Sequence, residues 1–134
     1  MNLKVIELVS LNHEVFGLIN QATNEIVVEG LLKTVANQKL KMIVHRLGKV
    51  TSEETKTYEE LRKALYLKYG EEKDGMVEIQ EKDKQEFIKE LTELEALDKE
   101  IDTKSLWGDT DVQALLEKEN TSEYYPVFYK LIGV

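Results

Sequence analysis

The side chains that most often carry catalysis are few in this sequence, and their spacing does not match known catalytic patterns. The two histidines, His13 and His45, have no second metal-binding residue four positions away, as the HExxH pattern requires. There is no cysteine, which excludes a disulfide framework, a thiolate metal site and a cysteine nucleophile. The GxSxG, GxGxxG and GxxxxGK[ST] patterns are absent too. We therefore predict no catalytic residue, no metal site, no cofactor and no enzymatic activity.

Carboxylates are abundant, but their context is that of a protein surface. Most of the 26 acidic residues lie in runs with lysines, which is typical of helix faces that meet water. Asp109 and Asp111 could form a metal-binding DxD pair, although an aspartate at a helix start more often serves as a cap. We therefore predict that Asp109 caps a short helix through Val112, Leu115 and Leu116.

Aromatic residues concentrate in the C-terminal third, and they are the best candidates for contact with a partner. Trp and Tyr are favoured both in cores and at the energetic centres of interfaces. For each residue alone a core position is favoured, but one or two exposed members would mark a docking surface. The candidate partner-binding residues are Trp107, Tyr124, Tyr125, Phe128 and Tyr129.

The charges are unevenly distributed along the chain, which has a net charge of -8. Residues 30–52 contain five basic residues and no acidic one, whereas acidic residues dominate from Glu53 and are dense over 71–102. We interpret the basic segment as a helix face that pairs with acidic elements or water, because no aromatic side chains interleave it to stack on bases. The alternative is a nucleic-acid contact. The acidic segment is a solvated helix face or, alternatively, a mimic of nucleic acid.

Length and hydropathy indicate one domain, 1–134, with a mainly α (α+β) fold. With 134 residues there is little room for a second domain, and 42% hydrophobic residues suffice to form a core. No apolar run reaches the roughly 18–20 residues of a membrane span, and the N-terminus lacks the apolar region of a signal peptide. We expect a location in the cytoplasm.

The central feature is a predicted long antiparallel helical hairpin over 31–97. Apolar spacing of three and four favours one continuous helix over 31–69, and the alternative is a break at Gly48 with a new helix capped by Thr51. In the continuous helix, the polar segment 51–57 would lack a packing partner. Gly70 would end the helix, and a second helix would return from Asp83 with Leu61 buried between the two, so that Leu61→Asp would unfold the hairpin.

Shorter elements flank this hairpin. A helix is expected within 3–22, although residues 3–6 fit a strand equally well, and residues 26–28 are extended. A strand at 76–79 follows a turn at 73–75 and would pair with a second strand at 100–104, giving a small two-stranded β element at the turn end of the hairpin. The parts are therefore 1–30 (helix and extended segment), 31–97 (hairpin) and 98–134 (short strand, short helix and an aromatic tail packed into the fold).

The middle of the chain resembles small accessory proteins of tailed bacteriophages, which are acidic and largely helical. The resemblance covers about 31–105 and is carried by Lys56–Gly75 (KTYEELRKALYLKYGEEKDG), Val77–Ile79 (VEI) and Gln85–Leu91 (QEFIKEL). It implies a non-enzymatic phage protein that acts by protein–protein contact, in virion structure or assembly. The alternative is an acidic inhibitor of a host defence or transcription protein. The expected partner is a virion component or a host protein, with homo-oligomers allowed, no membrane and no direct nucleic-acid binding. The location would be the infected bacterial cytoplasm or the virion.

Overall fold

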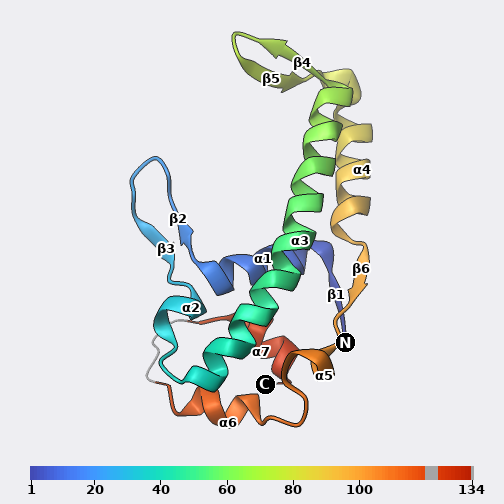
Figure 1. Cartoon of the computed structure of the whole chain (residues 1–134). Coiled ribbons are helices and arrows are strands. Elements are labelled where there is room, and N and C mark those ends of the chain that lie inside the picture. The colour runs from blue at the N-terminus through green and yellow to red at the C-terminus, as the bar shows by residue number, and fades with distance from the viewer. Residues whose placement is uncertain (120–123, 134) are drawn as a thin grey trace.

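The protein is mainly helical, as predicted, and its described residues form three small two-stranded sheets. We describe it from a computed structural model that covers residues 1–119 and 124–133 (Figure 1). In chain order the elements are β1 (Asn2–Lys4), α1 (Val5–Phe16), β2 (Leu18–Ile19), β3 (Ile26–Val28), α2 (Leu31–Thr34), α3 (Gln38–Tyr69), β4 (Gly70–Lys73), β5 (Met76–Ile79), a 3-10 turn (Glu81–Asp83), α4 (Lys84–Glu95), β6 (Asp98–Glu100), α5 (Thr103–Trp107), α6 (Val112–Glu117) and α7 (Pro126–Ile132).

The long helix α3 runs through Gly48 without a break, as the apolar spacing predicted, but it begins seven residues later than expected. Its start is fixed by Asn37, whose side-chain oxygen accepts a hydrogen bond from the backbone N–H of Leu40 at 3.0 Å. Residues 31–34 form the separate helix α2, and the extended Val35 that follows it is buried in the core. The cap at Asn37 and the burial of Val35 together end α2 before α3 begins.

The middle of α3 is covered by α1, which crosses it at Gly48. A Cβ atom at position 48 would lie 2.8 Å from the Phe16 ring and 3.0 Å from a methyl group of Val15, so any larger residue would force these side chains to shift. The polar segment that follows does have a packing partner, contrary to expectation. Thr51 is fully buried, and its hydroxyl accepts a hydrogen bond from the Asn12 side chain at 3.1 Å.

Two regions of the molecule differ in packing, and we name them here. The body consists of the sheet β1–β6, α1, α2, the first half of α3 and α5–α7. The stem consists of α3 from Tyr58 onward, the hairpin β4–β5 and α4. The hydrophobic core lies in the body and is formed by Leu3, Leu8, Leu11, Val15, Leu31, Val35, Leu40, Ile43, Val44, Leu47, Ile101, Leu106, Val112, Leu116, Tyr125, Phe128 and Leu131.

The predicted strand pairing was wrong. The strand at 76–79 exists as β5, but it pairs with β4, which directly precedes it, through a tight turn with Asp74 and Gly75 both at positive φ. Residues 98–100 form β6, which pairs antiparallel with β1 at the N-terminus. A two-residue turn joins β4 to β5 at little entropic cost, so the local pairing is favoured over the distant one.

In the stem, α4 returns alongside α3 from the β4–β5 end (Figure 1). Phe87 packs between the rings of Tyr66 and Tyr69, at centroid distances of 4.9 and 6.3 Å. Leu61 is 48% exposed, so the expectation that it is buried between the helices was wrong. The twelve-residue α4 lies beside only part of α3 and leaves this side chain at the edge of the contact.

Two helix ends also differ from the predictions. Asp111, rather than Asp109, caps α6, because its side-chain oxygen accepts a hydrogen bond from the Ala114 N–H at 3.0 Å. The first helix ends at Phe16 instead of extending to about residue 22. Gly17, with φ of 90°, turns the chain into the hairpin β2–β3.

Candidate protein-interaction surfaces

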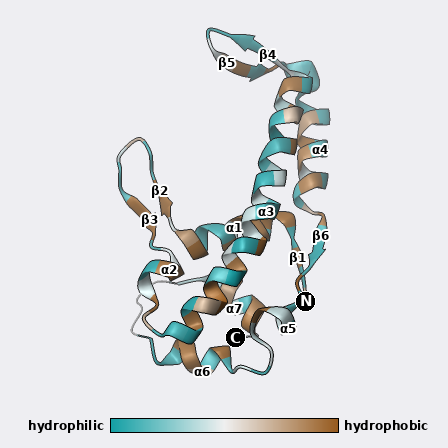
Figure 2. Ribbon diagram, in the orientation of Figure 1, coloured by the Kyte–Doolittle hydropathy of each residue, from teal (hydrophilic) through white to brown (hydrophobic). Residues whose placement is uncertain are grey.

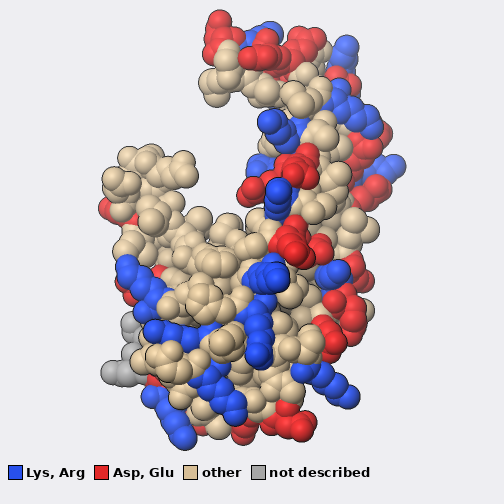
Figure 3. Space-filling model, in the orientation of Figure 1, with Lys and Arg blue, Asp and Glu red and all other residues tan. Residues whose placement is uncertain are grey.

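The most apolar exposed part of the molecule is the β2–β3 hairpin, which projects from the body as an arm (Figure 1). Four of its side chains, Leu18, Ile19, Ile26 and Val27, are exposed, and Ile19 and Val27 each expose 56% of their surface. The two strands appear brown in Figure 2, and the arm carries almost no charge in Figure 3. A group of apolar side chains that lies exposed on a protein surface usually marks a contact with another molecule.

The base of the arm is held by hydrogen bonds from the C-terminal tail. The hydroxyl of Tyr125 donates to the backbone carbonyl of Glu29 at 2.9 Å and lies 3.1 Å from the Thr34 hydroxyl. Gly30 follows Glu29 and lies so close to the end of α1 that a Cβ atom there would be 2.5 Å from the Val15 carbonyl oxygen. The arm is therefore anchored at its base although its apolar residues are exposed.

The sequence did not predict this arm, because Leu18 and Ile19 continue the helical spacing of α1. Signals for a hairpin were nevertheless present. Gly17 and Gly30 bracket two apolar segments, and Asn24, which adopts a left-handed conformation with φ of 58°, lies between them. Asparagine and glycine favour such turns, so a bracketed segment of this kind indicates a β-hairpin.

The five aromatic candidates are divided between core and surface. Tyr125 and Phe128 are completely buried and belong to the core, while Trp107 and Tyr129 pack against it and are partly buried. Tyr124 is 72% exposed, and its ring lies 5.4 Å from that of Tyr129. Of the five, Tyr124 alone presents most of its surface to a partner, and Tyr125 instead anchors the arm.

The structure also contains a buried carboxylate that the sequence pattern did not reveal. Glu14 is only 5% exposed, and its two oxygens accept hydrogen bonds from the backbone N–H groups of Val127 and Phe128, at 3.2 and 2.9 Å. It therefore caps the N-terminus of α7 from a different helix. Burial raises the pKa of Glu14, and the two N–H donors oppose this shift. The group has a structural partner for each oxygen, which accounts for its burial.

A shallow apolar groove of about 440 Å³ runs between α3 and α4 in the stem. Its apolar lining consists of Leu61, Ala64, Leu65, Leu94 and Leu97, and its edges carry Lys68, Glu90 and Glu93. Close to the groove, the hydroxyl of Tyr58 donates a 2.5 Å hydrogen bond to Glu95. Burial and this hydrogen bond raise the pKa of Tyr58 to about 12. These contacts hold α4 against α3.

Charge separates the two ends of the molecule (Figure 3). Lysine and arginine side chains gather over the lower part of the body, whereas the β4–β5 end of the stem is mostly acidic. The exposed stripe of α3 in the body contains Lys39, Met42, Arg46 and Lys49, and we name it the basic face. The exposed residues Glu71, Glu72, Asp74 and Glu78 form the acidic tip.

Within residues 1–119 and 124–133, no group of three or more His, Cys, Asp or Glu side chains is placed to hold a metal ion. In the same part of the chain, no helix has an apolar segment long enough to cross a bilayer. Comparison with protein-family models, with curated proteins and with solved structures gave no match. A proposal for the function therefore rests on the surfaces of the molecule and on the sequence resemblance described above.

Proposed function

We propose that this protein acts by binding another protein, and that it serves in the structure or assembly of a tailed-phage virion. The exposed apolar arm β2–β3 carries this proposal, because its four large apolar side chains each leave more than a third of their surface exposed to solvent. The resemblance of residues 31–105 to small phage accessory proteins supplies the biological setting.

The arm has the properties expected of a docking element. An isolated two-stranded hairpin is marginally stable in water, and this one presents apolar side chains to solvent. If Ile19 and Val27 were buried in an interface, each would contribute roughly 1–2 kcal/mol to the free energy of binding, at about 25 cal/mol per Å² of apolar area. The Tyr125 anchor fixes the direction of the arm before binding, so less conformational entropy is lost on association.

The stem supports the same function by giving the molecule reach. In this proposal α3 and α4 form an antiparallel helical hairpin, with the β4–β5 element at its turn end. Because α3 begins in the core of the body and continues as one helix into the stem, it fixes the orientation of the stem relative to the body. The protein would thus act as a rigid adaptor between two components of a particle.

The arm is tested by a charge substitution with a matched control. In Ile19→Asp/Val27→Asp, two exposed side chains of the arm become charged, and affinity purification from infected cells should lose the partner captured by the wild-type chain. The control Leu67→Asp/Ile88→Asp alters two stem residues that are exposed to a similar extent, and it should retain the partner. Circular dichroism checks that both variants fold, and mass spectrometry identifies the partner and searches for the protein in intact particles.

A partner that stays bound to the arm variant would exclude the arm as the docking element. A chain that is strictly monomeric and absent from particles would count against a virion role as a whole.

A second function is favoured by the acidic tip and is kept as the alternative. Glu71, Glu72, Asp74 and Glu78 are exposed at the end of the stem, where they could replace the phosphates of a nucleic acid in an enzyme of host defence or transcription. A nuclease or polymerase captured from host lysate at low salt, and lost at high salt, would support this alternative.

A further inference from the structure

The acidic tip contains an unfavourable arrangement of charges. In the β4–β5 pairing, Glu71 lies directly opposite Glu78, so two carboxylates share one face of the hairpin. Like charges in directly opposed positions destabilise a strand pair. Lys73 lies 3.9 Å from Glu78, but both side chains are about two-thirds exposed, so this ion pair compensates only weakly. A cationic surface that docks on this face would remove the repulsion.

The basic face, in turn, carries positive charges without carboxylate partners in the described part of the chain. Lys39, Met42, Arg46 and Lys49 follow a spacing of three, four and three residues, which places them in one exposed stripe of α3. Among the residues that the structure describes, none of its three cations forms an ion pair with a carboxylate. The Arg46 guanidinium donates a hydrogen bond to the backbone carbonyl of Leu106 at 3.2 Å.

From this complementarity we infer that the acidic tip of one molecule docks on the basic face of a second copy of the same chain. Each surface also presents one exposed methionine, Met76 on the tip and Met42 on the basic face. Met76 lies directly opposite Lys73 and on the same face of the hairpin as Glu71 and Glu78. The flexible methionine side chains supply an adaptable apolar contact between the charges.

A second copy is favoured over a nucleic acid as the occupant of the basic face. No aromatic side chain lies in the stripe to stack on bases, and the net charge of -8 repels a phosphate backbone at longer range. The acidic tip, in contrast, supplies carboxylates on a compact two-stranded hairpin whose width suits one face of a helix.

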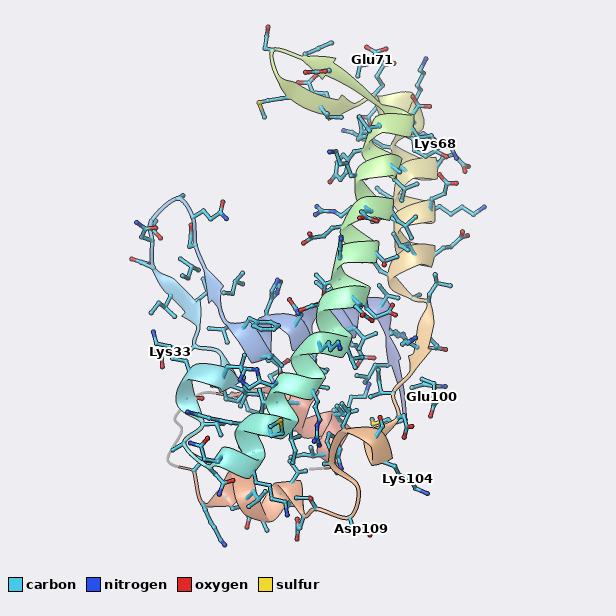
Figure 4. The ribbon with its side chains drawn as sticks, viewed as in Figure 1. Lys33, Lys68, Glu71, Glu100, Lys104 and Asp109 are labelled. Atoms are coloured by element: carbon cyan, nitrogen blue, oxygen red, sulfur yellow. The ribbon has the colours of Figure 1, made fainter. Side chains whose placement is uncertain are left out.

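The contact must form between molecules, because one helix separates the two surfaces. Lys49 and Tyr69, the last residue of α3, are 20 residues apart in this helix, which corresponds to about 30 Å. In Figure 4, Glu71 lies at the far end of the stem and Lys33 lies in the body. The two surfaces differ, so the contact is head to tail, and each added copy leaves one tip and one basic face free. The protein would therefore form rings or open chains, which deepens the proposed role in assembly and rests on it.

Sedimentation velocity of the full chain over a range of concentrations tests this inference. We expect the chain to self-associate at low salt. The association should weaken at 0.5 M NaCl, because the screening length, roughly 10 Å at 0.1 M salt, becomes shorter as the salt concentration rises. The reversals Glu71→Lys/Glu78→Lys and Lys39→Glu/Lys49→Glu should each raise the dissociation constant by roughly 10-fold or more. The control Glu60→Lys/Glu86→Lys changes exposed stem residues by the same total charge and should associate like the wild type.

Mixing the two reversed variants gives the decisive result. Each reversed surface then meets its complement on the other variant, so an equimolar mixture should regain the association that neither variant shows alone. If a reversed variant fails to fold, Glu71→Gln/Glu78→Gln replaces it and should weaken association in the wild-type background. A wild-type chain that stays monomeric at low salt, or a mixture that stays monomeric, overturns the inference.

Two further outcomes distinguish this inference from DNA binding and from the proposed function. Binding of a 30-base-pair DNA duplex that is abolished by Lys39→Glu/Lys49→Glu, without self-association, would assign the basic face to nucleic acid and overturn the inference. Failure of self-association together with retained capture of a partner through Ile19 and Val27 would overturn the inference alone and leave the proposed function in place.

Discussion

The body and the stem use the same helix in two different ways. In the body, α3 buries Leu40, Ile43, Val44 and Leu47 against α1 and the C-terminal helices. In the stem the same helix packs against α4, and Tyr58 and Phe87 are buried large apolar side chains there. The body therefore determines whether the chain folds, and the stem is a projection whose stability is local.

This difference indicates where function can evolve or be altered without loss of the fold. Exposed side chains of the stem and the arm, including Ile19, Val27, Leu67 and Ile88, contribute little to the core. Substitutions there should change binding, whereas substitutions in the body should change stability. The predictions below test this division, beginning with the largest expected effect.

A matched pair of phenylalanines tests the division directly. Phe128→Ala removes a fully buried ring from the body core and should lower the free energy of unfolding by about 3–5 kcal/mol. Phe87→Ala removes a buried ring between Tyr66 and Tyr69, where each aromatic pair adds about 0.5–1.5 kcal/mol to the burial of the ring. Because this ring lies outside the hydrophobic core of the body, its site can collapse more readily, and the total loss should be smaller. Urea denaturation should show the larger loss for Phe128→Ala, and hydrogen exchange should accelerate in α4 but not in α1 for Phe87→Ala. Equal losses spread over the whole chain would contradict the division.

The second prediction concerns the buried cap at Glu14. Glu14→Ala leaves the N–H groups of Val127 and Phe128 without their acceptor and should cost about 1–3 kcal/mol, measured by urea denaturation. Glu14→Gln keeps one acceptor oxygen and should cost less. A variant as stable as the wild type would show that α7 does not depend on this cap.

The pH dependence of stability, compared between the wild type and Glu14→Gln, gives a further test of this cap. Burial of the carboxylate raises the pKa of Glu14 in the folded protein above its ordinary value of 4.5. The folded state therefore binds this proton more tightly than the unfolded state, and stability falls as the pH rises from 4.5 through the folded pKa. The wild-type chain should lose stability relative to Glu14→Gln over this range, since the amide does not titrate. Comparison with Glu14→Gln cancels the contributions of the other acids.

Parts of the fold were predictable because their signals are local. The phase that Leu40, Ile43 and Leu47 establish resumes at Tyr58 and Leu61, and it correctly predicted a helix through Gly48. The Lys73–Gly75 turn is likewise a local signal and was correct. The pairing of β1 with β6 joins residues almost a hundred positions apart, and no spacing within either strand reveals it.

The candidate surfaces were only partly predictable, for the same reason. Aromatic composition pointed to the C-terminal tail, but whether Tyr124 or Tyr125 is exposed depends on how α7 packs against α1. The exposure of Ile19 and Val27 depends on how the arm projects from the body. Burial of Glu14 depends on the distant N–H groups of α7. These are tertiary properties.

The third prediction concerns the crossing of α1 and α3. In an isolated helix Gly48→Ala would be stabilising by about 1 kcal/mol. Here the new methyl group would contact Phe16 and the fully buried Val15, and such overpacking costs about 1–3 kcal/mol. We expect a net loss of about 1 kcal/mol in thermal denaturation. Phe16→Ala combined with Gly48→Ala should show a smaller loss from the Gly48 change, and an increased stability of the single variant would exclude a tight crossing.

An effect of similar size, but confined to the stem, is expected at the hydrogen bond between Tyr58 and Glu95. Tyr58→Phe removes the hydroxyl and should lower stability by about 1 kcal/mol, with the change confined to hydrogen exchange in α4 and the adjoining part of α3. The fold raises the pKa of Tyr58 from its ordinary value of 10.0 to about 12. The hydroxyl therefore contributes its full stabilisation below pH 10 and loses it as the pH rises from 10 to about 12. Over that interval the wild-type stem should approach the exchange rates of the Tyr58→Phe stem, while the Glu14 cap in the body, already ionised, contributes no further change. A wild-type stem that keeps its advantage above pH 12 would show that packing of the ring, rather than the bond to Glu95, holds α4 in place.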